Sequence, residues 1–223
     1  MEFQVSFPIN NKIYLRDPES TDLGKLIVKK AIDLIYTIGF EQFTFKKLAI
    51  EIQTTEATIY RYFENKHRLL LYILNWYWYY MQFLIEYRVQ NITSTKLKLE
   101  MLLDILTSDL PISITKTDYN KKWLNEIVMV ESSKVYLVKD IDAINKEQFF
   151  QPYKDLCAYI AQLIKEYQPK YKYPHSLSST LIETSHNQLY FSLHLPRLTD
   201  IKNQDYQKYI KTYLHHLLFS LLA

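Results

Sequence analysis

The segment from 54 to 67, TTEATIYRYFENKH, gathers hydroxyl, aromatic and basic side chains on neighbouring residues. Three threonines precede a Tyr-Arg-Tyr-Phe run, and a lysine-histidine pair follows it. Hydroxyls and cations can hold phosphate oxygens, and aromatic rings can stack on bases. The segment could therefore belong to a hydrophobic core, to a nucleotide platform or to the reading head of a DNA-binding module.

Groups that could support catalysis or hold a metal ion are scarce. No Ser/His/Asp grouping or phosphate-binding glycine loop is recognisable. Glu183 and His186 have the i, i+3 spacing of helical di-iron sites, but such sites need further carboxylates, so a solvated or hydrogen-bonded pair is the simpler interpretation. One cysteine, Cys157, excludes an intrachain disulfide and a Cys-rich zinc site. We expect no enzyme, no cofactor and no metal site.

Composition favours an all-α fold. The 223 residues are 48% hydrophobic, which is ordinary for a globular protein and sufficient for a sizeable core. The only glycines are Gly24 and Gly39, whereas a β-sandwich needs many tight turns. A net charge of +3 permits nucleic-acid binding without arguing for it. Any such binding would rest on a few placed cations.

Two segments bear on cellular location. The N-terminus lacks the basic region and the long apolar core of a secretory signal. Residues 69–85 form the most apolar run, but Asn75 and Gln82 interrupt it, so a buried helix is favoured over a membrane span. We expect a cytoplasmic protein with no membrane contact. An aromatic stripe in this run could line a pocket for an apolar or aromatic molecule, or could pack in the core: Trp76, Tyr77, Tyr79, Tyr80 and Phe83.

Apolar residues recur every three or four positions from Asp22, which predicts a helix ending at Gly39 after an N-terminal arm over 1–21. Thr44 can cap a second helix, and residues 53–55 separate it from a third helix over 56–63. Further helices are predicted over 66–88, 96–109, 121–132, 141–167 with a possible interruption at Pro152, 177–195 and 205–222.

Three short helices with a three-residue turn match the layout of a helix-turn-helix, whose last helix can enter a major groove. The run from Leu26 to Leu70 resembles the DNA-binding domain of TetR/AcrR-type transcriptional regulators. The resemblance rests on Gly39-Phe40, on Thr44, on Leu48-Ala49 and, above all, on Ile59-Tyr60-Arg61-Tyr62-Phe63 followed by Lys66 and Leu69. It implies a helix-turn-helix domain over 22–69 and a helical regulatory and dimerisation domain over 70–223.

The resemblance also implies which residues meet DNA. Contacts to phosphate or bases are expected from Thr44, Thr54, Thr55, Glu56, Ala57, Thr58, Tyr60, Arg61, Tyr62 and Lys66. Two residues depart from the family pattern. Gln53 stands where the turn usually has glycine, which places a non-glycine residue at positive φ. Glu56 would be repelled by phosphates, although it could accept a hydrogen bond from a cytosine amino group.

The last two predicted helices carry wide apolar faces, and in the family the corresponding helices pair across a two-fold axis. The resemblance therefore implies a homodimer whose two reading heads meet a pseudo-palindromic operator. The residues expected at the dimer interface are Leu181, Leu189, Leu193, Ile210, Leu214 and Leu217.

The leading hypothesis is a transcriptional regulator, more often a repressor than an activator, that binds double-stranded operator DNA. A small apolar or aromatic effector would release it from the DNA, provided that the effector binds the other conformation more tightly. The alternative is a helical small-molecule-binding protein or enzyme in which the N-terminal three-helix segment is only structural.

Overall fold

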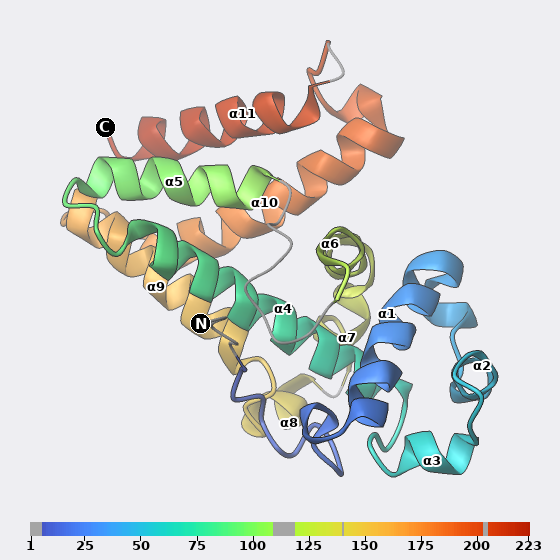
Figure 1. Cartoon of the computed structure of the whole chain (residues 1–223). Coiled ribbons are helices and arrows are strands. Elements are labelled where there is room, and N and C mark those ends of the chain that lie inside the picture. Colours follow the sequence, from blue (N-terminus) through green and yellow to red (C-terminus); the bar gives the residue numbers. More distant parts are fainter. Residues whose placement is uncertain (1–5, 109–118, 140, 203–204) are drawn as a thin grey trace. The chain divides into compact units, whose positions relative to one another are not determined.

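The computed structural model describes residues 6–108, 119–139, 141–202 and 205–223, and every regular element within these ranges is helical (Figure 1). This confirms the all-α prediction. In chain order the helices are α1 (Asp22–Gln42), α2 (Phe45–Glu51), α3 (Glu56–Tyr60), α4 (Lys66–Val89), α5 (Thr95–Thr107), α6 (Lys121–Glu131), α7 (Ser133–Tyr136), α8 (Ile141–Lys146), α9 (Gln151–Tyr167), α10 (Pro174–His194) and α11 (Tyr206–Leu221), with 3-10 turns η1 (Pro18–Ser20) and η2 (Pro196–Leu198).

The chain divides into two compact units. The first comprises residues 1–80 and 110–152, and the second comprises residues 81–109 and 153–223. The boundary between residues 80 and 81 falls inside α4, so this helix contributes to both cores. These units reflect packing, and the functional boundary expected after residue 69 stays a prediction.

Helix α1 begins and ends for identifiable reasons. The Thr21 hydroxyl caps its start by accepting the Gly24 N–H at 3.0 Å. Gly24 is needed because a Cβ there would lie 2.3 Å from the Pro18 carbonyl oxygen of η1. Gly39 has φ 75° and ψ 157°, which breaks the helix where the sequence predicts its end.

The core of the first unit is built around the N-terminal part of α4. Trp76, Tyr77 and Tyr80 are buried, which confirms the core interpretation for these members of the aromatic stripe. Helix α6 packs on α1, and the buried Glu131 carboxylate accepts the Phe40 N–H at 3.0 Å. The same carboxylate pairs with Lys134 at 2.8 Å. The end of α1 is thereby tied to α6.

The second unit packs α11 against α5 and α10 (Figure 1). Ile210 and Leu214 of α11 and Leu181 of α10 are buried inside this unit. Their assignment to a dimer interface is therefore wrong: in a helix with several apolar positions, they occupy the face turned to the chain's own core. The other three residues of that prediction are more accessible: Leu189 and Leu217 are half-buried, and Leu193 is 46% exposed.

One predicted helix is two helices. The segment over 141–167 breaks between α8 and α9 at Gln148, which has φ 61°. Pro152 is not the cause of the break, because it lies in the first turn of α9, where a missing N–H costs nothing. The short helix α7 was not expected from the sequence. The described part of the N-terminal arm is irregular apart from η1, and it buries Ile9 and Ile13.

The Glu183 carboxylate accepts a hydrogen bond from the Tyr153 hydroxyl at 2.7 Å. The Glu-x-x-His spacing recurs at Glu64 and His67, where Glu64 instead pairs with Arg68 at 3.6 Å. No three His, Cys, Asp or Glu side chains in the described ranges are placed to hold a metal ion. None of the helices found there has the length and apolarity that crossing a membrane requires.

Candidate nucleic-acid interface

The turn between α2 and α3 is a Schellman motif built on a glutamine. After Ile52 ends α2, the Gln53 N–H donates to the Ile50 carbonyl at 3.2 Å and the Thr54 N–H donates to the Ala49 carbonyl at 2.9 Å. This motif requires a left-handed residue, and Gln53 supplies it with φ 53°. The positive φ expected at Gln53 is confirmed. The turn has the geometry usually given by glycine, at the cost of backbone strain.

Hydroxyl groups organise the starts of both helices. Thr44 caps α2 by accepting the Lys47 N–H at 3.2 Å, as predicted. Thr55 caps α3 by accepting the Thr58 N–H at 3.3 Å, and the Thr55 and Thr58 hydroxyls lie 3.0 Å apart. Thr44 and Thr55 are exposed, so a hydroxyl and free backbone N–H groups face solvent at each helix start.

Helix α3 is held from one side and open on the other. Ile59 and Phe63 are fully buried and fix the helix to the core. The Tyr60 side chain is 48% exposed and rests edge-on against Phe45, with ring centroids 5.0 Å apart. The other outward residues predicted to meet DNA divide by exposure: Glu56, Ala57 and Arg61 are exposed, and Thr54 and Thr58 are half-buried.

Tyr62 does not belong to this exposed face. Its side chain is 2% exposed, and its hydroxyl lies 2.8 Å from the Thr21 hydroxyl that caps α1. The Arg16 guanidinium lies over its ring, 5.4 Å from the centroid. Helix α3 ends at Tyr60, so the chain has already turned inward at Tyr62. The prediction that Tyr62 contacts phosphate is therefore wrong.

Lys66 is engaged within the chain as well. Its ammonium donates to three backbone carbonyls after the Gly39 break: Phe40 at 3.0 Å, Glu41 at 3.2 Å and Phe43 at 3.2 Å. An ammonium has three donors, so none is left for a phosphate. The phosphate contact predicted for Lys66 is corrected to a cap on the end of α1, which a cation suits because unpaired carbonyls carry partial negative charge.

The cations of this face are therefore few. Arg61 is exposed, and no ion pair engages it among the described residues. Lys46, in the first turn of α2, is exposed in the same way and was not among the residues predicted from the sequence. The sequence indicates this position, because Lys46 lies two residues after the predicted cap Thr44 and therefore in the first turn of the helix. Lys47 instead donates to the Gln42 carbonyl at 2.8 Å. Two cations, two capped helix starts and one tyrosine could bind a phosphate backbone.

Comparison with known proteins gives a family match for the segment that contains this turn. Residues 27–73 match the model of the bacterial regulatory proteins of the tetR family. No curated protein matches the chain.

Similar solved structures cover most of the chain. The fatty acid degradation regulator FadR from Bacillus halodurans is 18% identical with a TM-score of 0.62, covering 86% of this chain and 93% of its own. Apo AibR is 14% identical with a TM-score of 0.55, covering 86% and 96%. AibR in complex with isovaleryl coenzyme A and operator DNA is 16% identical with a TM-score of 0.56, covering 87% and 98%. At these identities the likeness shows a shared fold.

Proposed function

We propose that this chain, whose residues 27–73 carry the N-terminal domain of the tetR family of bacterial regulatory proteins, is a DNA-binding transcriptional regulator rather than an enzyme. The observation that carries the proposal is the built turn between α2 and α3. Gln53 accepts left-handed strain so that the exposed start of α3 projects from a buried anchor at Ile59 and Phe63. Strained backbone of this kind is common at functional sites.

Each outward group has a distinct role in the proposed complex. The hydroxyls and N–H groups at Thr44 and Thr55 would position the phosphate backbone. The first turn of α3 would approach base edges, where Glu56 selects for a cytosine amino group and against phosphate. Arg61 and Lys46 would neutralise phosphate charge, or Arg61 would reach a guanine.

Affinity and its salt dependence test the proposal. DNA from upstream of the chain's own coding sequence should be bound at low salt. Arg61→Ala should weaken binding by roughly tenfold for each lost charge-assisted contact, which is roughly a hundredfold for a dimer with one such contact per protomer. Arg88→Ala is the matched control, because Arg88 is an exposed arginine in the last turn of α4 and is not among the residues expected to meet DNA.

The salt slope identifies the kind of contact. Each lost phosphate contact reduces the slope of log K against log salt by about 0.9, so a dimer of Arg61→Ala should lose nearly two. If the chain does not bind this DNA at about 50 mM salt, the proposal of a regulator is wrong, and the alternative of a helical small-molecule-binding protein or enzyme is favoured.

A homodimer is proposed because two reading heads are needed for a pseudo-palindromic operator. The accessible apolar residues of α10 and α11 are the candidate interface. Leu189 and Leu193 share one face of α10 by their i, i+4 spacing, and Tyr213 and Leu217 share one face of α11. Light scattering should show a dimer that Leu193→Glu dissociates, whereas Leu97→Glu at an exposed position of α5 should not. A monomeric wild-type chain would contradict this.

The proposed regulator responds to a small apolar or aromatic effector. The support is the solved AibR complex, which holds both isovaleryl coenzyme A and operator DNA. An effector releases DNA only by binding the DNA-free conformation more tightly. Short-chain acyl coenzyme A thioesters are therefore the first compounds to add to the binding assay, and unchanged DNA affinity at millimolar concentration would exclude them.

A further inference from the structure

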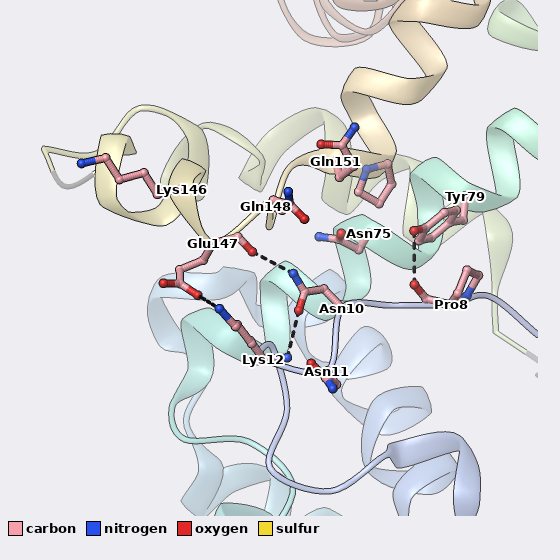
Figure 2. Close-up of a pocket in the computed structure, with 11 residues that line it drawn as sticks. Pro8, Asn10, Asn11, Lys12, Asn75, Tyr79, Lys146, Glu147, Gln148 and Gln151 are labelled. Atoms are coloured by element: carbon pink, nitrogen blue, oxygen red, sulfur yellow. Dashed lines mark hydrogen bonds and ion pairs between the residues drawn. The ribbon is translucent and has the colours of Figure 1, made fainter.

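A polar cavity of about 550 Å³ opens within the first unit, between the N-terminal arm, α4 and the connection from α8 to α9 (Figure 2). This volume falls in the range of small-molecule sites. Five of its lining side chains are amides: Asn10, Asn11, Asn75, Gln148 and Gln151. Tyr79, one of the two members of the aromatic stripe that are not fully buried, adds a ring and a hydroxyl that donates to the Pro8 carbonyl at 3.2 Å. The cavity is therefore lined for hydrogen bonding rather than for an apolar ligand.

Asn75 carries the strongest sign that the cavity has an occupant. Its side chain is 3% exposed, and its amide nitrogen donates to the Leu71 carbonyl at 2.8 Å and the Phe149 carbonyl at 2.9 Å. Those two bonds fix the orientation of the amide. Its Oδ1 has no hydrogen-bond partner among the described residues. A buried acceptor without a donor is costly, so a donor from a bound molecule would relieve it.

The walls around Asn75 are held in place. Asn10 donates to the Glu147 carbonyl at 2.8 Å and accepts the Lys12 N–H at 3.0 Å, which fastens the arm to the α8–α9 connection (Figure 2). Gln148 shapes the opposite wall with φ 61°, a left-handed conformation that glutamine adopts only under strain. Strained backbone beside a cavity is common at binding sites.

The charges of the lining define the class of ligand. Lys12 and Glu147 pair at 2.6 Å and cancel each other, and Lys146 points away from the other lining residues (Figure 2). What remains is a set of amides, of which Asn75 offers an acceptor while Asn11 and Gln148 each carry a donor and an acceptor. A hydroxyl matches such groups because it offers both.

We propose that this cavity binds a neutral polyhydroxylated small molecule, a sugar or sugar alcohol, with one of its hydroxyls donating to Asn75 Oδ1. The ring of Tyr79 provides an apolar wall for the carbon skeleton. The inference does not depend on DNA binding, and the site differs in chemistry from the apolar effector proposed above.

Isothermal calorimetry on the full chain, without DNA, tests the proposal with glucose, ribose, sucrose and sorbitol as probes. At least one probe should bind saturably with one site per chain. Asn11→Trp should abolish that binding, because Asn11 is exposed and a larger side chain there fills the cavity without disturbing a buried contact. Asn187→Trp, at an exposed position of α10, is the matched control and should bind as wild type does.

Asn75→Ala should weaken the binding at least tenfold, and Asn11→Trp keeps the test decisive if that variant fails to fold. Binding of none of the four probes would overturn the proposal. So would binding that survives Asn11→Trp, or binding of glucose 6-phosphate in place of the neutral probes. Gel shifts with Asn11→Trp are run separately. If Asn11→Trp loses sugar binding but keeps DNA binding, the result concerns the sugar site alone. If the wild-type chain does not bind DNA, the proposal of a regulator fails and the proposal of a sugar site is unaffected.

Discussion

Replacing Gln53 by glycine should stabilise the protein. A side chain in the left-handed region costs about 1–2 kcal/mol, because its Cβ crowds the following carbonyl. Gln53 has φ 53° and an exposed side chain without a hydrogen bond among the described residues, so the substitution removes the crowding and loses no contact. Both backbone bonds of the Schellman motif remain.

Glycine also makes the unfolded chain more flexible, which costs roughly 0.4–1 kcal/mol. The two terms leave a net gain of about 0.5–1 kcal/mol. Urea unfolding followed by circular dichroism should show a higher midpoint with an unchanged slope, and the melting temperature should rise by about 2–3 °C for a chain of this size.

Two controls separate the strain from other effects of the substitution. Gln53→Ala keeps a Cβ and should stay within about 0.5 kcal/mol of wild type, since crowding persists. Gln162→Gly places the same change in the middle of α9, where glycine should destabilise by about 1 kcal/mol. A Gln53→Gly protein no more stable than wild type would refute the strain argument.

Three further outcomes are expected. Lys66→Met should destabilise the fold by about 2–3 kcal/mol in urea unfolding, because three carbonyls lose a charged donor; a stable variant with a reduced salt slope would restore the phosphate contact instead. Tyr62→Phe should cost about 1 kcal/mol of stability by removing the hydroxyl pair with Thr21 and should leave DNA affinity unchanged, whereas Tyr60→Ala should do the reverse. Burial lowers the pKa of His186 to about 4, so as the pH falls the unfolded chain takes up its proton before the folded chain does. The stabilisation from the neutral imidazole should be complete above pH 6.5, and the free energy of unfolding should fall by about 3 kcal/mol between pH 6.5 and pH 4. His186→Gln should flatten that dependence in urea midpoints measured at each pH.

The sequence predicts best the features that depend on neighbouring residues. The break at Gly39, the cap at Thr44 and the strained turn at Gln53 are local, and all three are confirmed. Each follows from backbone geometry and from bonds within a few residues. The same holds for Ile59 and Phe63, whose i, i+4 spacing marks the buried side of the segment.

What the sequence could not supply depends on partners far along the chain. The carbonyls that bind Lys66 lie 23 to 26 residues away. Tyr62 meets Thr21 across 41 residues, and the pattern alone could not show that α3 ends before it. The cavity forms where the arm meets a segment 137 residues later, at Asn10 and Glu147. Periodicity also cannot decide which apolar face of α11 meets α5, which is why Ile210 and Leu214 were misassigned.

The peptide groups of Phe40 join three helices. Its N–H is held by Glu131 of α6, and its carbonyl is held by Lys66 of α4, directly after the Gly39 break in α1. A displacement of either α4 or α6 would therefore pull on the same residue. Gly39 lies between that residue and the long straight part of α1, and its permissive backbone can act as a swivel. A pull at Phe40 would then turn the short helices that follow it more readily than it would bend α1, so α2 and α3 would tilt while the helix before them kept its direction.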